Sequence, residues 1–227
     1  MTWALARTGA TVVAVEFDRR LVPALEEVVA GFANVRIEVA DAMKSDWGSV
    51  LDGPGPWAVV ANLPYNVAVP VVMRLLDEES RVRHFLIMVQ REVGMRLVAG
   101  PGDEQYGAVS VRVAYRAEGR VVRRVAPSVF WPRPTVDSVL VSLARRSPPV
   151  EVDEAALWEV IGEAFAQRRK TMRNAMLRLG LEATEALEIL AECGVDSKAR
   201  AEELGLPEFA CLATAWRRAR PPGGAHT

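Results

Sequence analysis

The chain has 227 residues, of which 50% are hydrophobic and 25% charged, and its formal net charge is −1. This is the composition of a globular protein with room for one main domain and a smaller second one, and its bulk charge gives no sign of a polyanionic partner. The two cysteines, Cys193 and Cys211, lack the spacing of a metal site or of a disulfide framework. We therefore expect no metal, a packing role for both cysteines and a reducing, cytoplasmic environment.

In chain order, runs of β-branched and apolar residues alternate with stretches whose apolar residues have helical spacing. The predicted strands are 11–17, 35–39, 57–63 and 85–90, and the predicted helices are 21–32, 67–76 and 91–98. This alternation predicts an α/β fold built on a doubly wound sheet. The apolar segment 57–76 is interrupted by two asparagines and two prolines, so we expect no membrane span there.

After Gly107 the order of elements changes. A helix to about Arg116 precedes two predicted strands, near 120–125 and 136–143, and the absence of a crossover helix between them predicts an antiparallel edge. From Val152 onward the pattern is helical. We expect a Rossmann-like domain over residues 1–148 and a small all-helical domain over residues 149–227, which ends in a frayed tail rich in Pro and Gly.

Charge is distributed unevenly along the chain. Residues 1–106 carry fourteen acids and ten bases, whereas residues 107–149 carry eight arginines and two acids. A second basic cluster, without an acid between its members, consists of Arg168, Arg169, Lys170, Arg173 and Arg178. Two interpretations stay open: one side of the protein that faces phosphates, or ordinary solvated helix faces.

Polar side chains end three successive predicted strands: Glu16, Asp41 and Asn62. In open α/β sheets, ligands bind beyond the carboxyl ends of the strands. A carboxylate such as Glu16 suits the ribose hydroxyls of a nucleotide-like ligand, and Asp41 suits an adenine amino group with Met43 packed on the ring. For each acid alone, an exposed strand end or a helix cap is the alternative. No GxGxG loop occurs in the chain.

The segment Asn62-Leu63-Pro64-Tyr65-Asn66 follows the third predicted strand. Adenine N6 is a poor nucleophile because its lone pair is delocalised into the ring. Two acceptors aimed at its hydrogens, the Asn62 side-chain oxygen and the Pro64 carbonyl, would favour a pyramidal, more nucleophilic nitrogen, and Tyr65 offers a face for stacking. The pattern indicates methylation of an exocyclic amine, and a Pro-containing turn with a buried Tyr is the alternative.

At these residues the sequence resembles the KsgA-like ribosomal RNA small-subunit adenine N6-dimethyltransferases. The resemblance extends over essentially the whole chain and rests on seven segments in the family's order. They are VVAVEFDRRL (12–21), ADAM (40–43), NLPYN (62–66), VQREVGMRLVAGPG (89–102), YGAVSV (106–111), PSVFWPRPTVDSVLV (127–141) and FAQRRKTMRN (165–174).

The resemblance implies S-adenosyl-L-methionine as cofactor and a Rossmann-like methyltransferase sheet with a small helical C-terminal domain. By position it assigns cofactor binding to Glu16, Asp41, Ala42 and Asn62. It assigns the target pocket to Asn62, Leu63, Pro64 and Tyr65, and the other face of the flipped adenine to Phe130.

The resemblance also implies the reaction and the partner: dimethylation of two adjacent adenosines near the 3′ end of 16S rRNA during ribosome biogenesis. The FAQRRKTMRN segment is expected to be a basic helix that contacts RNA phosphates through Arg168, Arg169, Lys170 and Arg173. We expect the partner to be the immature small ribosomal subunit and the protein to be a cytoplasmic monomer.

The sequence departs from the family at its front, where an Asn-Phe-Leu element, a first strand and a Gly-rich cofactor loop are expected and absent. We expect a misassigned or truncated start. Two alternatives stay open. One is a non-catalytic assembly factor that binds the small subunit, and the other is a macrolide-resistance methyltransferase acting on large-subunit rRNA.

Overall fold

The computed structural model describes residues 1–64 and 66–220, and the chain divides into two compact units. The first unit consists of residues 1–57 and 66–82. The second unit consists, among the described residues, of 58–64 and 83–220. The predicted domain boundary at residue 148 is a different division and stays a prediction.

The first unit contains a parallel pair of strands, β1 (Val12–Glu16) and β2 (Val35–Val39), joined by α2 (Val22–Val29). Val12 lies opposite Val35 and Glu16 opposite Val39, as expected for two β-branched runs with a crossover helix. Three further helices complete the unit: α1 (Thr2–Ala6), α3 (Trp47–Val50) and α4 (Ala68–Glu78). Asn34 connects two of these parts because its side-chain Nδ2 donates to the carbonyls of Ala6 (2.9 Å) and Ala10 (2.7 Å).

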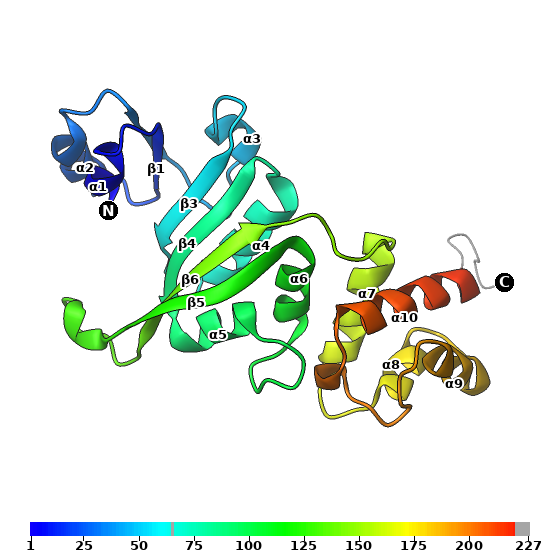
Figure 1. Ribbon diagram of the computed structural model, residues 1–227. Helices are drawn as coiled ribbons and strands as arrows, with labels where there is room; N and C mark the ends of the chain where they lie inside the picture. Colours follow the sequence, from blue (N-terminus) through cyan, green and yellow to red (C-terminus); the bar gives the residue numbers. More distant parts are fainter. Residues whose placement is uncertain (65, 221–227) are drawn as a thin grey trace. The chain divides into compact units, whose positions relative to one another are not determined.

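The second unit is built on a four-stranded sheet in the order β3-β4-β6-β5 (Figure 1). The strands are β3 (Trp57–Asn62), β4 (Val82–Gln90), β5 (Ala117–Val125) and β6 (Ser138–Arg145). Strand β6 pairs antiparallel with both β4 and β5, which confirms the predicted antiparallel edge.

Helices α5 (Arg91–Val98) and α6 (Ala108–Arg116) lie against this sheet (Figure 1). A Cβ at Gly94 would overlap a methyl group of Val139, so α5 approaches β6 too closely for any larger residue. This contact leaves Val89, Val139 and Val141 almost fully buried beneath the helix. The sheet core is therefore closed on the side that α5 covers.

The C-terminal part is helical, as predicted, with α7 (Glu154–Ala166), α8 (Met172–Arg178), α9 (Ala183–Glu192) and α10 (Leu206–Ala219). Two short 3-10 turns, η1 (Pro127–Val129) and η2 (Ala201–Glu203), were not predicted because one turn gives no periodic pattern. Leu157, Met176 and Phe209 are fully buried in a core that also includes Tyr106 and Tyr115. The helices thus share a core with the segment around α6.

Two expectations from the sequence are wrong. Cys193 and Cys211 form a disulfide, with their Cα atoms 5.7 Å apart, although their spacing of 18 residues suggests no framework. Only the packing of the end of α9 against α10 brings them together. The segment 165–174 is not one helix, because α7 ends at Ala166 and α8 begins at Met172. Thr171 forms an isolated β-bridge with Arg200, which draws the chain out of the helical path.

No helix within residues 1–64 and 66–220 combines the length and the apolarity that a membrane crossing requires.

Candidate functional site

Glu16 and Asp41 lie at the same edge of the β1–β2 pair. Glu16 is the last residue of β1, and its carbonyl accepts a hydrogen bond from the Ala40 N–H at 3.0 Å, one residue before Asp41. Glu16 Oε1 accepts from the Asp18 N–H at 2.7 Å, and Asp41 Oδ1 accepts from the Met43 N–H at 2.8 Å. Each carboxylate is thus oriented through one oxygen, and within the described part of the chain the other oxygen has no hydrogen-bond donor. Such oxygens suit ribose hydroxyls or an amino group.

The loop that carries Asp41 and Ala42 is held by Arg74 from α4. The Arg74 guanidinium donates to the carbonyls of Ala42 (3.3 Å) and Ser45 (3.1 Å) and pairs with Glu78 at 2.6 Å. The Glu78 carboxylate raises the pKa of Arg74, and Arg74 in turn lowers the pKa of Glu78. Sequence reasoning missed Arg74. The feature of the sequence that points to Arg74 is that it is the only charged residue in the stretch 57–76.

Phe17 and Asp18 follow Glu16 in the turn after β1. The Asp18 carboxylate forms an ion pair with Arg20 at 2.6 Å, and this hydrogen bonding lowers the pKa of Asp18. The Phe17 side chain remains 72% exposed beside Glu16, which is unusual for a large apolar residue. Phe17 was not predicted as a site residue, although an aromatic residue directly after a strand-end acid is the feature of the sequence that points to it.

The second unit holds Asn62, Leu63 and Pro64. Asn62 ends β3, and the Leu63 N–H donates to the Met88 carbonyl at 3.2 Å, so the start of the loop runs beside the end of β4. Asn62 and Pro64 are exposed, and Leu63 is half-buried. Tyr65 lies outside the described residues.

Phe130 belongs to the same edge of this sheet. In the register of the sheet, Gln90 at the end of β4 and Val125 at the end of β5 both lie opposite Ser138 at the start of β6. The loop 126–137 that carries Phe130 leaves from this edge, where β3 also ends beside Met88. Phe130 is half-buried, and its N–H donates to the Pro127 carbonyl at 3.2 Å. The structure therefore brings Asn62, Leu63, Pro64 and Phe130 to one edge of the second unit, whereas Glu16, Asp41 and Ala42 belong to the first unit.

The four predicted RNA-binding residues are not equivalent. Arg168 donates to the Tyr106 carbonyl at 2.8 Å and lies 3.5 Å from a Glu202 carboxylate oxygen, so part of its bonding capacity is used inside the protein. Arg169 and Lys170 are exposed in the turn between α7 and α8, and Arg173 is half-buried in α8. Arg168 is better placed to hold this turn than to contact phosphates.

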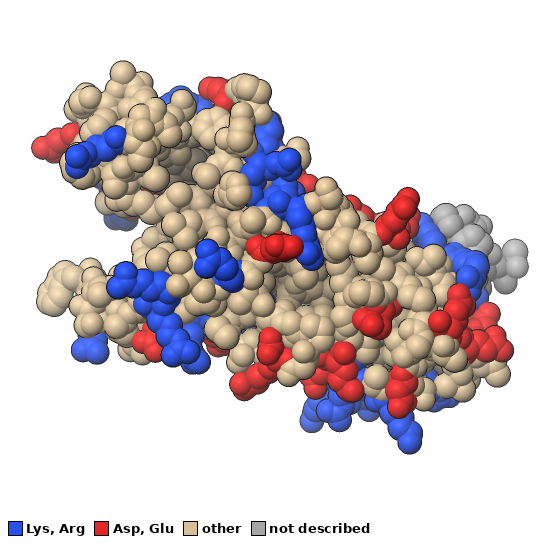
Figure 2. Space-filling view, viewed as in Figure 1, with Lys and Arg blue, Asp and Glu red and all other residues tan. Residues whose placement is uncertain are grey.

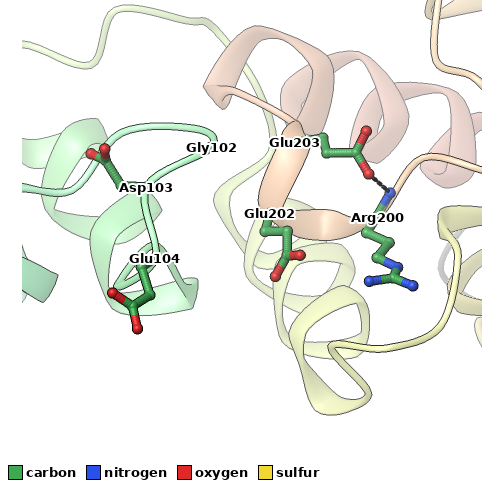
Figure 3. A pocket seen from close by; sticks show the side chains of 6 residues that line it. All are labelled: Gly102, Asp103, Glu104, Arg200, Glu202 and Glu203. Atoms are coloured by element: carbon green, nitrogen blue, oxygen red, sulfur yellow. Dashed lines mark hydrogen bonds between the residues drawn. The ribbon is translucent and has the colours of Figure 1, made fainter.

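A groove of about 440 Å³ lies between the loop after α5 and the turn η2 (Figure 3). Its lining consists of Gly102, Asp103, Glu104, Arg200, Glu202 and Glu203. The Glu203 carboxylate accepts from the Arg200 N–H at 2.8 Å, as the dashed line in Figure 3 marks. The groove contains none of the predicted site residues, and its four carboxylates make it unsuitable for an RNA phosphate.

Oriented acids after two parallel strands and an Asn-Leu-Pro loop at the end of the next strand fit the class of Rossmann-like methyltransferases that depend on S-adenosylmethionine. The model of the family "Ribosomal RNA adenine dimethylase" matches residues 1–214, and the chain belongs to this family. The protein is therefore an enzyme of the class that transfers methyl groups to adenine in ribosomal RNA.

Individual relatives agree with this assignment. The Ribosomal RNA small subunit methyltransferase A of Moorella thermoacetica is 44% identical over 222 residues, a match that covers 93% of this chain and 77% of the relative. A dimethyladenosine transferase from Plasmodium falciparum has a TM-score of 0.75 at 21% identity, with 89% of this chain and 80% of that chain covered. The 23S rRNA methyltransferase ErmE has a TM-score of 0.68 at 22% identity, with 91% and 82% covered. The two solved structures show the fold alone.

Proposed function

We propose that this chain carries out N6,N6-dimethylation of two adjacent adenosines near the 3′ end of small-subunit rRNA, in the immature small ribosomal subunit. The observation that carries the proposal is the 44% identity to a small-subunit methyltransferase over 93% of the chain. The likeness to the large-subunit enzyme ErmE is only 22% in sequence, so it favours no second substrate. A ribosomal substrate in a bacterial relative supports a cytoplasmic location, and we propose that the protein acts as a monomer.

The first unit fits the adenosine part of S-adenosylmethionine. We assign the ribose hydroxyls to Glu16 and the adenine amino group to Asp41 and the backbone of Ala42, because each carboxylate keeps an oxygen available. Phe17 adds an exposed apolar ring beside Glu16 on which a purine can pack. When bound, the cofactor supplies an electrophilic methyl group on a sulfonium.

Asn62, Leu63 and Pro64, with Tyr65 and Phe130, would hold the target base. The Asn62 side-chain oxygen and the Pro64 carbonyl are acceptors for the two N6 hydrogens, which keeps the nitrogen lone pair out of the ring and aimed at the methyl group. Tyr65 and Phe130 would stack on the extruded adenine, and stacking on one aromatic ring contributes roughly 1–3 kcal/mol per base. Positioning and local electrostatics then supply the catalysis without a strong base.

Small subunits from cells that lack this modification test the proposal. We expect the protein to transfer labelled methyl groups to them, and primer extension to stop at two adjacent adenosines near the 3′ end of the RNA. Asn62→Ala should lower the rate by about 10²–10³-fold because an oriented polar contact in the reacting pocket is lost. Ser80→Ala, which changes an exposed polar residue outside the 62–66 segment, is the control and should be close to wild type.

Three results would contradict the proposal. The first is modification of large-subunit RNA alone, which would assign a different substrate. The second is an undiminished rate in Asn62→Ala. The third is tight binding of small subunits without any calorimetric signal for S-adenosylmethionine, which would indicate a non-catalytic assembly factor.

A further inference from the structure

Strand β5 is the outer strand of the four-stranded sheet, and the chain continues from it into the loop 126–137. This segment exposes four arginines: Arg120, Arg123, Arg124 and Arg133. Residues 119–136 contain no Asp or Glu, and the first acid after them is Asp137. We call these four arginines together with Trp131 the β5 edge surface. Figure 2 shows Lys and Arg side chains gathered over the region that β5 and this loop occupy in Figure 1.

In the described part of the chain, no ion pair neutralises the four arginines of the β5 edge surface, in contrast to three other arginines of the same unit. Arg116 pairs with Glu154, Arg146 with Glu118 and Arg178 with Glu163. Within residues 1–64 and 66–220, no carboxylate forms an ion pair with any of the four arginines of the β5 edge surface. Their guanidinium groups are therefore available for an external anion, and a guanidinium matches the geometry of a phosphate.

A β-bulge arranges two of these arginines side by side. Arg120 lies opposite Ser142 of β6 and Arg123 lies opposite Leu140, with the register shifting between Val121 and Arg123. Ser142 and Leu140 are two residues apart, so their side chains point to the same face of the sheet, and so do those of the residues opposite them. Without the extra residue, positions 120 and 123 would point to opposite faces. The bulge thus creates a pair of cations on one face.

Trp131 has no structural role that would explain its position. Its side chain is 97% exposed, and the neighbouring Val129 is 68% exposed. Among the described residues, Trp131 forms no aromatic pair and no cation–π contact. An indole with both faces open beside a cluster of unpaired cations is the combination that binds single-stranded nucleic acid, in which bases stack and phosphates pair.

Protection of an open sheet edge is the simplest alternative explanation. Charged side chains on an edge strand prevent pairing with other chains, which would account for the arginines. It does not account for Trp131 and Val129, because exposed apolar residues next to an open edge favour association rather than oppose it.

We propose that the β5 edge surface binds the single-stranded rRNA that flanks the target adenosines, with the arginines on phosphates and Trp131 stacked on a base outside the methylated pair. This inference rests on the proposed function, because Phe130 of the target pocket is the residue directly before Trp131. It adds a contact that positions the RNA strand before a base enters the pocket.

The salt dependence of RNA binding tests the arginines. The probe is an unstructured RNA of about 16 nucleotides that contains two adjacent adenosines, a length within reach of a single-strand site. Replacing Arg120, Arg123 and Arg124 by Gln should reduce the slope of log Kd against log salt by about 2, since each phosphate contact contributes about 0.7. A control that removes three cations of the helical part, Lys198→Gln with Arg217→Gln and Arg218→Gln, should leave the slope unchanged. An unchanged slope in the β5 variant would overturn the inference.

Trp131 is tested separately because base stacking involves no charge and therefore does not change the salt dependence of binding. Trp131→Ala should weaken binding of the same RNA by roughly tenfold or more at an unchanged salt slope, and Trp131→Tyr should restore most of the affinity. The β5 variant and the Trp131 variants change exposed residues, and equal melting temperatures will show that folding is intact in all variants. Equal affinity of wild type and Trp131→Ala would contradict the stacking contact.

Two further outcomes separate this inference from the proposed function and from a protein partner. The RNA measurements need no methyl transfer, so an affinity that depends on the surface supports the inference even if ribosomal methylation fails. Loss of small-subunit binding in both β5 edge variants with unchanged affinity for the free RNA would indicate a protein docking surface instead, and would overturn the inference.

Discussion

The two units bury their strands to very different degrees. Every residue of β1 and β2 is half-buried or exposed, whereas Phe85, Ile87 and Val141 in the second unit are at most 1% exposed. The loops of the first unit are held by directed hydrogen bonds from Asn34 and Arg74. Glu16 and Asp41, to which we assign the cofactor in our proposal, are therefore positioned by polar contacts, whereas the sheet that carries Asn62 depends on a packed apolar core.

The largest difference should appear in core truncations. Phe209→Ala removes a fully buried ring from the helical core and should lower the free energy of unfolding by about 3–5 kcal/mol. Val13→Ala in half-buried β1 should cost about 1 kcal/mol or less, because little apolar area is lost. Urea denaturation of both variants gives the two values. Equal losses would show that the two units are equally dependent on packing.

The disulfide should be the next strongest contribution, and it also lies in the second unit. Replacing Cys193 and Cys211 by Ser should lower the free energy of unfolding by about 3 kcal/mol, the cost of releasing a loop of this size in the unfolded chain. The reduced wild-type protein is the control and should match the double variant. If thiol titration of the native protein finds two free cysteines, this bond does not form under those conditions.

Alkaline pH should weaken the second unit through Tyr106. Burial raises the pKa of the Tyr106 hydroxyl to about 12, and this hydroxyl donates to the Leu204 carbonyl. The folded pKa lies above the unfolded value near 10, so between these values the unfolded chain loses the proton more readily than the folded protein. The contribution of Tyr106 to the free energy of unfolding is therefore complete below pH 10, and it falls by up to about 3 kcal/mol as the pH rises towards 12. Tyr106→Phe should be less stable at pH 8 but should lose less between pH 10 and 12.

Arg74→Met should have the smallest effect on folding and act on the cofactor instead. The substitution keeps most of the side-chain volume but removes the donors to Ala42 and Ser45, so the Asp41 loop loses its anchor. We expect about tenfold weaker binding of S-adenosylmethionine by calorimetry, with urea midpoints close to wild type. Arg83→Met, an exposed arginine of β4, is the control. A large drop in the urea midpoint would assign Arg74 a role in folding, and its effect would then not be specific to cofactor binding.

Much of the fold was predictable because local patterns report local structure. The β-branched runs gave β1, β2 and β3 to within one residue, and the tight approach of α5 agrees with a glycine inside a helical pattern. The strand-end positions of Glu16 and Asn62 followed from those strands. The basic segment 165–174 was misread as one helix because the bridge between Thr171 and Arg200 joins residues far apart in sequence.

The sequence by itself determined the alternation of strands and helices between residues 11 and 98, the acids at the strand ends and the family, since all three depend on residue types at short spacing. Only the tertiary structure decided that β6 lies between β4 and β5, that Arg74 holds the Asp41 loop and that a bulge turns Arg120 and Arg123 to one face. The physical reason is that strand pairing, side-chain reach and register arise from contacts between distant segments. Hydrophobic periodicity does not specify such contacts.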